Sequence, residues 1–297
     1  MPDKNPTLHI SQLKEDFLDR LGLGLSLLRL DEIHPVFNGN KWYKLKYNLR
    51  EMHLLGKTHL VSFGGAFSNH LAAVAAAGYQ YGIRTTGIVR GEEHKPLNAT
   101  LSKAVEEGMN LEYVDRETYR NKPELMRWAE EKFGPEAYIL PEGGANELAF
   151  KGCLEILEGV SPVYEKICCA CGTGITLAGI ASSSNGRNRT VGFSALKDTS
   201  FFYRALSAYA GEKVADETSV ISEYHFGGYG KVKPELIFFV KEFYTTHGIQ
   251  LDYLYNGKMM FGIYDLARKD FFRPGTQILA IHTGGLQGNS GIDKETY

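Results

Sequence analysis

A short apolar run, a glycine-rich turn and an amphipathic segment follow one another repeatedly along this chain. Apolar runs of this length predict strands, and apolar residues recurring every three or four positions predict helices. Strands that alternate with helices form parallel sheets covered on both faces. The alternation therefore predicts an α/β protein with mainly parallel sheets, and it is clearest in HLVSFGG before SNHLAAVAAAG, RTTGIVRG before LNATLSKAVEEG, NLEYVDR before KPELMRWAEEKFG, AYILPEGG before ANELAFKGCLEIL, KICCACGTG before ITLAGIASSS, RTVGFSAL, and QILAIHTGG.

The alternation falls into two series, one from about His59 to Gly144 and one from about Lys166 to Gly285. Together they hold more strands than one small sheet usually contains, so we expect two three-layer α/β/α lobes. The predicted smaller domain covers residues 45–145, and the larger covers 1–44 and 146–297. Ligands of such folds bind at the carboxyl ends of strands, where this chain places paired glycines, so we expect a site in the cleft between the lobes.

Charge and hydropathy exclude several classes of partner. The chain has 33 Lys and Arg against 35 Asp and Glu, a net charge of −2, which gives no electrostatic reason to expect nucleic acid or an anionic membrane. The apolar run LAAVAAAG is far shorter than the roughly 20 residues of a membrane-spanning helix, and the polar start MPDKNPTLHI lacks a secretory core. We expect a soluble cytoplasmic protein.

Four cysteines occur, three of them within KICCACGTG. Metal sites need paired CxxC spacing or partner histidines, and Cys153, Cys168, Cys169 and Cys171 show neither. We interpret them as small, reduced residues of a buried strand and expect no metal.

The turn CGTGITLAG, which begins at Cys171, is typical of an anion site. Its glycines let backbone N–H groups approach an anion, and the positive end of the following helix favours a phosphate. A nicotinamide dinucleotide is the rival ligand, but Leu177 stands where the third glycine of that motif belongs, and no acid ends the strand RTVGFSAL. A plain strand-to-helix turn is the remaining alternative.

Two further segments hold candidate site residues. Ser68, Asn69 and His70 open an alanine-rich helix, where they are either a helix cap or a socket for a carboxylate. In FNGNKWYKLKY we expect a helix from about Asn40, with Lys44 and Lys46 on its solvated face and with Leu45, Leu49 and Met52 as its apolar stripe. Lys41 stands in the first turn, where the helix dipole favours a free amine that can bind a carbonyl covalently.

Several of these segments resemble motifs of a known enzyme family. GNKWYKLKYNL resembles the cofactor-lysine motif, FSNHLAAVAAAG the substrate-carboxylate loop, and CGTGITLAG the phosphate loop of pyridoxal-phosphate enzymes with the tryptophan synthase β-subunit fold. GGYG, LDYLYNGKMMFG and LAIHTGG are similar to segments of the D-cysteine desulfhydrase and 1-aminocyclopropane-1-carboxylate (ACC) deaminase family. The match spans residues 30–288. It implies pyridoxal 5′-phosphate as cofactor, a small amino acid as substrate and a homodimer.

The resemblance implies a role for each matching residue. Lys41 matches the lysine that binds the cofactor and moves protons at the substrate α-carbon, Asn69 the residue at the ring hydroxyl, and Ser68 the serine that holds the substrate carboxylate, with His70 beside it. Tyr229 and Tyr255 match two active-site tyrosines, for which packing is the alternative role. The matching phosphate cradle consists of Gly172, Thr173, Gly174, Ile175 and Thr176.

Positions 256 and 283 separate the activities within the family. In the ACC deaminases that the chain resembles, a glutamate facing the pyridine nitrogen and a leucine occupy these positions, whereas the desulfhydrases have two threonines. Here they are Asn256 and Thr283, both expected at the cofactor. Because an amide cannot supply the charge of a carboxylate, ring opening is disfavoured.

The sequence thus predicts a lyase that converts D-cysteine or a related D-amino acid to pyruvate, sulfide and ammonia. The alternatives are an ACC deaminase that forms 2-oxobutyrate, and more remotely an NAD-dependent dehydrogenase or a non-catalytic amino-acid binder.

Overall fold

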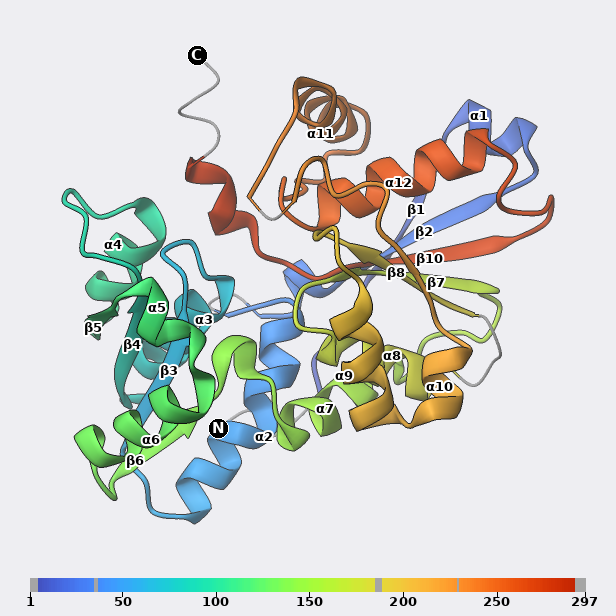
Figure 1. The fold of residues 1–297 in the computed structure, drawn as a ribbon. Helices are drawn as coiled ribbons and strands as arrows, with labels where there is room; N and C mark the ends of the chain where they lie inside the picture. The colour runs from blue at the N-terminus through green and yellow to red at the C-terminus, as the bar shows by residue number, and fades with distance from the viewer. Residues whose placement is uncertain (1–4, 35–36, 185–188, 229, 292–297) are drawn as a thin grey trace. The chain divides into compact units, whose positions relative to one another are not determined.

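The computed structural model describes residues 5–34, 37–184, 189–228 and 230–291, which belong to two compact units (Figure 1). His34–Gly152 forms most of the first unit, while Pro6–Ile33 and Cys153–Leu286 form the second. Both units are α/β with mainly parallel sheets, as predicted. The chain passes between units at residues 33–34 and 152–153, whereas the sequence prediction placed the smaller domain at residues 45–145.

The first unit contains a parallel sheet of order β5-β4-β3-β6. Each predicted run and amphipathic segment of the first series appears as a strand or a helix of this unit. The elements are α2 (Asn40–Leu54), β3 (His59–Gly64), α3 (Asn69–Tyr81), β4 (Arg84–Arg90), α4 (Ala99–Glu106), β5 (Met109–Val114), α5 (Arg116–Arg120), α6 (Lys122–Phe133), β6 (Ala137–Leu140), the 3-10 helix η2 (Glu142–Gly144) and α7 (Glu147–Cys153).

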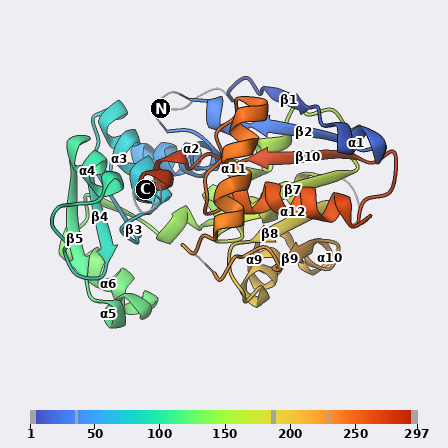
Figure 2. The ribbon, with the colours of Figure 1, turned by 90° about the horizontal axis from the view of Figure 1, so that it is seen from above.

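Helices cover both faces of this sheet, with α3 and α4 on one side and α5 and α6 on the other (Figure 2). Successive residues of a strand point to opposite faces. In β3, Val61 and Phe63 accordingly join the core under α5 and α6, while Ser62 hydrogen-bonds to His70 of α3. This alternation directs one side chain of a buried strand toward the helix that begins with the Ser-Asn-His segment.

The second unit contains a six-stranded sheet of order β1-β2-β10-β7-β8-β9, parallel except for the β1–β2 pair. Its N-terminal strand pair was not part of either predicted series. The elements are β1 (Ile10–Leu13), α1 (Asp16–Arg20), β2 (Gly24–Arg29), η1 (Leu30–Glu32), η3 (Leu154–Leu157), β7 (Lys166–Cys171), α8 (Ile175–Ser183), β8 (Thr190–Ser194), α9 (Ser200–Ala210), α10 (Glu212–Asp216), β9 (Ser219–Ile221), α11 (Pro234–His247), α12 (Asn256–Arg268) and β10 (Gln277–His282). The 3-10 helix η4 (Leu286–Gly291) follows, and from Gln287 on it belongs to the first unit.

Figure 1 shows α11 and α12 on one face of this sheet and α8, α9 and α10 on the other. Strand β8 shows how each face is filled. Gly192 lies against Leu177 of α8, and Phe193 lies against Gly262 of α12. The predicted three-layer arrangement is therefore present in each unit.

The four cysteines are buried, as the sequence predicted, and none of them forms a disulfide. Burial raises the pKa of the Cys168 thiol to about 12, and burial likewise raises the pKa of Cys171 to about 12. Both thiols therefore stay protonated and unreactive. Within the described residues, no group of three or more His, Cys, Asp or Glu side chains is arranged to hold a metal ion. Of the described helices, none is long and apolar enough to cross a bilayer.

Gly152 of α7 packs directly against the backbone of α2. A Cβ atom on Gly152 would lie 2.0 Å from the Tyr43 carbonyl oxygen, and a backbone atom cannot move aside as a flexible side chain can. We predict that Gly152→Ala lowers the free energy of unfolding by about 3 kcal/mol, measured by urea titration.

Gly82→Ala is the matched control for this prediction. Gly82 has a φ of +65°, and nothing lies within 4 Å of the added Cβ. The free energy of unfolding of this variant therefore falls by only about 1 kcal/mol, because alanine disfavours the left-handed backbone conformation. Equal losses in the two variants would contradict the packing argument.

Candidate active site

Lys41 lies in the first turn of α2, where the sequence predicted it. The helix begins at Asn40 because Gly39 adopts a φ of 68°, a left-handed conformation that suits glycine. The half-buried Lys41 Nζ donates a hydrogen bond of 2.8 Å to Asn40 Oδ1. Its amine is thus held near the start of the helix and does not extend into bulk solvent.

The prediction that Lys44 and Lys46 lie on a solvated face was wrong. Lys44 is 2% exposed and Lys46 is 5% exposed. Lys44 Nζ donates to the Gly143 carbonyl oxygen at 3.0 Å, and Lys46 Nζ donates to Asn5 Oδ1 at 2.6 Å. A long aliphatic stem lets a lysine cross an apolar region to reach a distant acceptor, which local charge pattern does not reveal.

Ser68 caps α3, since its Oγ accepts a hydrogen bond from the Leu71 N–H at 3.2 Å. The capping interpretation of Ser68 is thereby confirmed. Asn69 follows as the first residue of the helix, and its Oδ1 is buried without a hydrogen-bond partner among the described residues. A buried acceptor left in this state is costly, so a ligand that donates a hydrogen bond there would be stabilised.

His70 points into the core of the first unit. Its Nε2 donates to Ser62 Oγ at 2.9 Å, because the Ser62 hydroxyl itself donates to the Leu140 carbonyl oxygen at 2.8 Å. Burial holds the pKa of His70 well below its usual range, and the nearby charges of Lys41 and Lys44 lower it further. This geometry gives a neutral His70 a role in the core through its Nε2, while its Nδ1 is buried without a hydrogen-bond partner among the described residues. The predicted contact of His70 with a substrate stays a prediction.

The glycine turn between β7 and α8 leads into the first turn of α8. Gly174 has a φ of +85° and caps α8, and a Cβ atom there would lie 2.9 Å from Ala205 Cβ. The turn continues through the half-buried Gly172 and Thr173 into the buried Ile175 and Thr176. With the N–H groups of the first turn of α8, it has the form of a phosphate cradle.

Tyr255 lies beside this turn. A Cβ atom on Gly172 would be 3.3 Å from the Tyr255 hydroxyl oxygen and 3.3 Å from its Cε1, so the ring borders the predicted cradle. The Tyr255 backbone N–H donates to Asp252 Oδ1 at 2.7 Å. Tyr229, the other tyrosine predicted at the site, lies outside the described residues.

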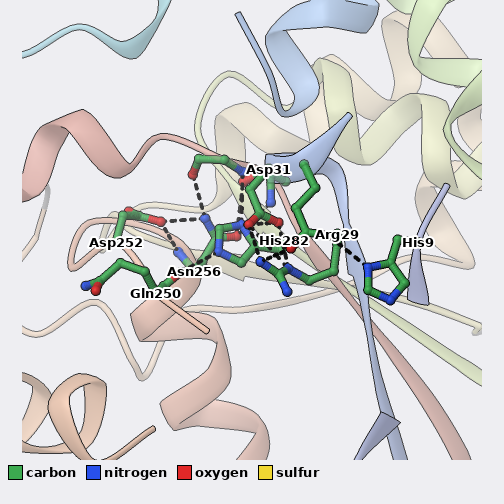
Figure 3. A network of polar contacts seen from close by, with 10 residues as sticks. His9, Arg29, Asp31, Gln250, Asp252, Asn256 and His282 are labelled. Carbon is green, nitrogen blue, oxygen red and sulfur yellow. Dashed lines mark hydrogen bonds and ion pairs between the residues drawn. The ribbon is translucent and has the colours of Figure 1, made fainter. Parts of the chain in front are cut away.

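Asn256 and Thr283 are brought together by the start of α12 and the end of β10. Figure 3 shows Asn256 beside Asp252. Asn256 Nδ2 donates to Asp252 Oδ2 and, at 2.9 Å, to the Gly284 carbonyl oxygen. Asn256 Oδ1 accepts from the Thr283 N–H at 2.9 Å and from the Thr283 hydroxyl at 3.1 Å. The side chain of Asn256 is fully buried.

Sequence analysis missed Asp252, the buried carboxylate of this group. Its Oδ1 accepts from the N–H groups of Leu254 and Tyr255, and its Oδ2 accepts from the Asn256 N–H. Burial raises the pKa of Asp252, while these hydrogen bonds favour its charged form. An Asp shortly before a helix is a recognised capping signal, so LDYLYN could have indicated this residue.

Further polar residues continue the network beyond β10 (Figure 3). The Gly284 N–H donates to His282 Nδ1 at 3.1 Å, and His282 Nε2 lies 2.8 Å from the Gln250 carbonyl oxygen. Nδ1 also lies 3.5 Å from Asp31 Oδ1, and Arg29 donates to Asp31 from the end of β2. These residues are far apart in sequence, so only the sheet order places them together.

Comparison with known proteins identifies the family. Residues 5–284 match the family model described as pyridoxal-phosphate dependent enzyme. The chain belongs to this family. It is accordingly a pyridoxal-phosphate dependent enzyme, and its substrates are small molecules.

Two curated relatives are 30% and 28% identical to this pyridoxal-phosphate dependent enzyme over the aligned residues. A protein of Pyrococcus horikoshii with the provisional name 1-aminocyclopropane-1-carboxylate deaminase is 30% identical, over 93% of this chain and 84% of the relative. The mitochondrial bifunctional D-cysteine desulfhydrase/1-aminocyclopropane-1-carboxylate deaminase of Arabidopsis thaliana is 28% identical, over 90% of this chain and 73% of the relative.

A solved structure shows the same fold. The crystal structure of an ACC deaminase homologue superposes with a TM-score of 0.81 at 25% identity, covering 99% of this chain and 93% of the other. A hydrogen sulfide-producing enzyme of Fusobacterium nucleatum, at a TM-score of 0.68 and 12% identity, shares the fold over 95% of this chain and 96% of its own.

The residues of this pyridoxal-phosphate dependent enzyme fit the cofactor. The buried, unpartnered Oδ1 of Asn69 suits a hydroxyl donor, and the turn from Gly172 to Thr176 presents backbone N–H groups suited to a phosphate. Lys41 supplies a half-buried amine. Each unit therefore contains side chains or backbone groups that match a different part of pyridoxal phosphate.

The neutral His70 makes stability depend on pH. Because its folded pKa is lowered, below about pH 6.5 the unfolded chain binds a proton that the folded protein does not. We therefore predict that the free energy of unfolding falls as pH decreases through this value, and that His70→Asn reduces this slope by up to about 1.4 kcal/mol per pH unit. Urea titrations between about pH 5 and 8 measure the slope.

The exposed His53 is the control, since His53→Asn leaves the slope unchanged. If His70→Asn also left it unchanged, His70 would be protonated alike in the folded and unfolded states.

Proposed function

We propose that this enzyme is a lyase that eliminates the β-substituent of D-cysteine or a related D-amino acid and releases pyruvate, sulfide and ammonia. The observation that carries the proposal is the pair Asn256 and Thr283, which places no carboxylate at either of the two positions that separate the activities. The similarity to the bifunctional Arabidopsis thaliana enzyme supports the same reaction class.

ACC deamination is the second candidate, because several relatives bear that name. Opening a cyclopropane needs a stronger electron sink than expelling a thiolate, and a carboxylate at the pyridine nitrogen would strengthen that sink. Asn256 is an amide whose side chain is already engaged within the protein. This favours elimination over ring opening.

Two earlier alternatives lose support. The family is pyridoxal-phosphate dependent, and Leu177 is buried inside α8 at the position where a dinucleotide motif needs glycine. A nicotinamide-dependent dehydrogenase is therefore disfavoured. A non-catalytic binder would have little use for the amine of Lys41.

The proposal gives each residue a task. Bound pyridoxal phosphate withdraws electrons from the substrate α-carbon and so acidifies its proton. Lys41 Nζ would hold the cofactor through its amine and would take up this proton. Ser68 holds the substrate carboxylate, Asn69 Oδ1 accepts from the ring hydroxyl, and Gly172–Thr176 holds the phosphate. The assignment of Lys41 and the phosphate turn to one cofactor rests on the family.

The overall reaction balances with water as the only co-reactant. The Cα–H proton is transferred to Lys41, the Cβ–S bond breaks, and its electron pair leaves with sulfur. Sulfur takes up a proton, for which the Tyr255 hydroxyl beside Gly172 is a candidate donor. Hydrolysis of the remaining three-carbon unit then gives pyruvate and ammonia.

Lys41→Ala tests the central assignment. We predict that this variant loses the yellow absorbance of bound cofactor and at least about 1,000-fold in turnover, since the proposal assigns to Lys41 both the binding of the aldehyde and the transfer of the proton. Lys46→Met, which alters another buried lysine of the same helix, keeps both. Retained turnover in Lys41→Ala would refute the role of Lys41.

The identity of the released keto acid tests the substrate. The purified enzyme, loaded with pyridoxal phosphate, is offered D-cysteine, L-cysteine and ACC separately, and we expect pyruvate from D-cysteine alone. Formation of 2-oxobutyrate from ACC would overturn the argument from Asn256 and Thr283. A homodimer and a cytoplasmic location remain predictions, and analytical ultracentrifugation measures the first.

A further inference from the structure

Arg90 stands at the end of the first unit's sheet where α/β folds bind their ligands. It is the last residue of β4, at the carboxyl end of that strand, and it is exposed. Arg84, at the other end of β4, pairs with Glu136 at 3.3 Å. Among the described residues, by contrast, no carboxylate forms an ion pair with Arg90 and no group accepts a hydrogen bond from its side chain. The guanidinium group of Arg90 is thus available to an anion.

The guanidinium group of Arg90 lies beside the segment that leads into α3. Its Cζ is 5.8 Å from the centroid of the buried Tyr119 ring. A Cβ atom on Gly65 would lie 3.6 Å from Arg90 Nη2. In the part of the chain that the structure describes, no other heavy atom outside residues 64–66 lies within 4 Å of that position. The space beside Gly65 is therefore open and is bordered by a positive charge.

A second arginine lies at the same edge of the sheet. A Cβ atom on Gly91 would lie 3.7 Å from Arg116 Nε, and no described carboxylate pairs with Arg116. Two carboxylates of this edge are engaged elsewhere, since Glu142 pairs with Lys122 at 2.7 Å and Asp115 Oδ1 accepts from backbone N–H groups of α5. Guanidinium groups bind carboxylates through paired, charge-assisted hydrogen bonds, so this edge suits an acidic ligand.

Arg90 and the start of α3 are close enough to bind two ends of one small molecule. A Cβ atom on Gly64 would lie 2.5 Å from Ser68 Oγ, and Gly65 is the next residue. Because consecutive Cα atoms are about 3.8 Å apart, Ser68 Oγ and Arg90 Nη2 are separated by at most about 13 Å. An amino acid whose α-carboxylate lies at Ser68 can therefore reach Arg90 with a side chain that ends in a second acid.

We propose that Arg90 is a specificity-determining residue that binds an acidic group on the β-substituent of the substrate while Ser68 holds the α-carboxylate. The inference rests on the proposed function, which assigns the α-carboxylate to Ser68. It deepens that function by naming the substrate class, D-cysteine derivatives whose sulfur carries an acidic substituent. The Cα–H proton is removed, the Cβ–S bond breaks, and its electron pair leaves with sulfur, which takes up a proton. Water then releases pyruvate and ammonia.

The first experiment offers the enzyme, loaded with pyridoxal phosphate, two substrates of almost the same shape. S-carboxymethyl-D-cysteine carries the acid, and S-carbamoylmethyl-D-cysteine carries a neutral amide in its place. We expect the wild type to favour the acid at least about tenfold in kcat/KM, mainly through KM, because the charge-assisted contact is remote from the reacting atoms. Pyruvate release measures both rates.

Variants of two arginines on β4 decide whether Arg90 causes this preference. Arg90→Gln abolishes the preference, Arg90→Lys keeps part of it because the charge remains without the planar fork, and Arg90→Glu reverses it. Arg84→Gln, at the other end of the strand, is the control and keeps the wild-type ratio. An equal loss for both substrates in Arg90→Gln, or a wild type without preference, would overturn the proposal.

The second experiment needs no turnover. D-2-aminoadipate and its neutral side-chain amide have a CH₂ group in place of sulfur, so they lack the leaving group, and calorimetric titration of the loaded enzyme gives the Kd of each. Tighter binding of the acid that is lost in Arg90→Gln supports the inference, and if no D-cysteine derivative then releases pyruvate, the proposed function alone is refuted. Equal binding of the two compounds by an enzyme that converts D-cysteine would refute the assignment of Arg90 alone.

Discussion

The buried carboxylate of Asp252 organises the part of the second unit where α12 begins and β10 ends. It accepts hydrogen bonds from the N–H groups of Leu254, Tyr255 and Asn256, and so determines where α12 begins. It also holds the side chain of Asn256, which in turn binds both residues that follow β10. A carboxylate taken out of water needs several donors, and meeting that need brings a helix start and a strand end into a defined arrangement.

In the first unit, a buried chain of hydrogen bonds between uncharged groups also connects a helix with strands. His70, Ser62 and the Leu140 carbonyl form a buried chain of hydrogen bonds that ties α3 to β3 and β6. At the start of the same helix, Ser68 Oγ accepts a hydrogen bond from the Leu71 N–H. His70 Nδ1 and Asn69 Oδ1, from neighbouring residues of this helix, are buried without a hydrogen-bond partner among the described residues, and Asn69 Oδ1 is the acceptor that a cofactor hydroxyl would complete.

Much of the fold and part of the site could be predicted from local pattern. The apolar runs and glycine turns correspond to β3, β4, β5, β6, β7, β8 and β10, and Gly174 has the left-handed conformation that suits a cradle. Residues whose surroundings come from distant segments were assigned less well. Lys44 binds a carbonyl about a hundred positions away, and His70 is surrounded by β3 and Gly144, so neither environment is visible in the neighbouring sequence.

The sequence by itself determined the α/β class, the order of the strands and helices, and the family, because apolar periodicity, glycine turns and motif order are local properties of the chain. Only the tertiary structure decided what individual polar side chains do. Asn256, Asp252 and Thr283 reach their partners when β10 lies beside β7 and α12 packs across them. The state of a buried polar group depends on which donors and acceptors surround it in space, and that depends on the folding of the whole unit.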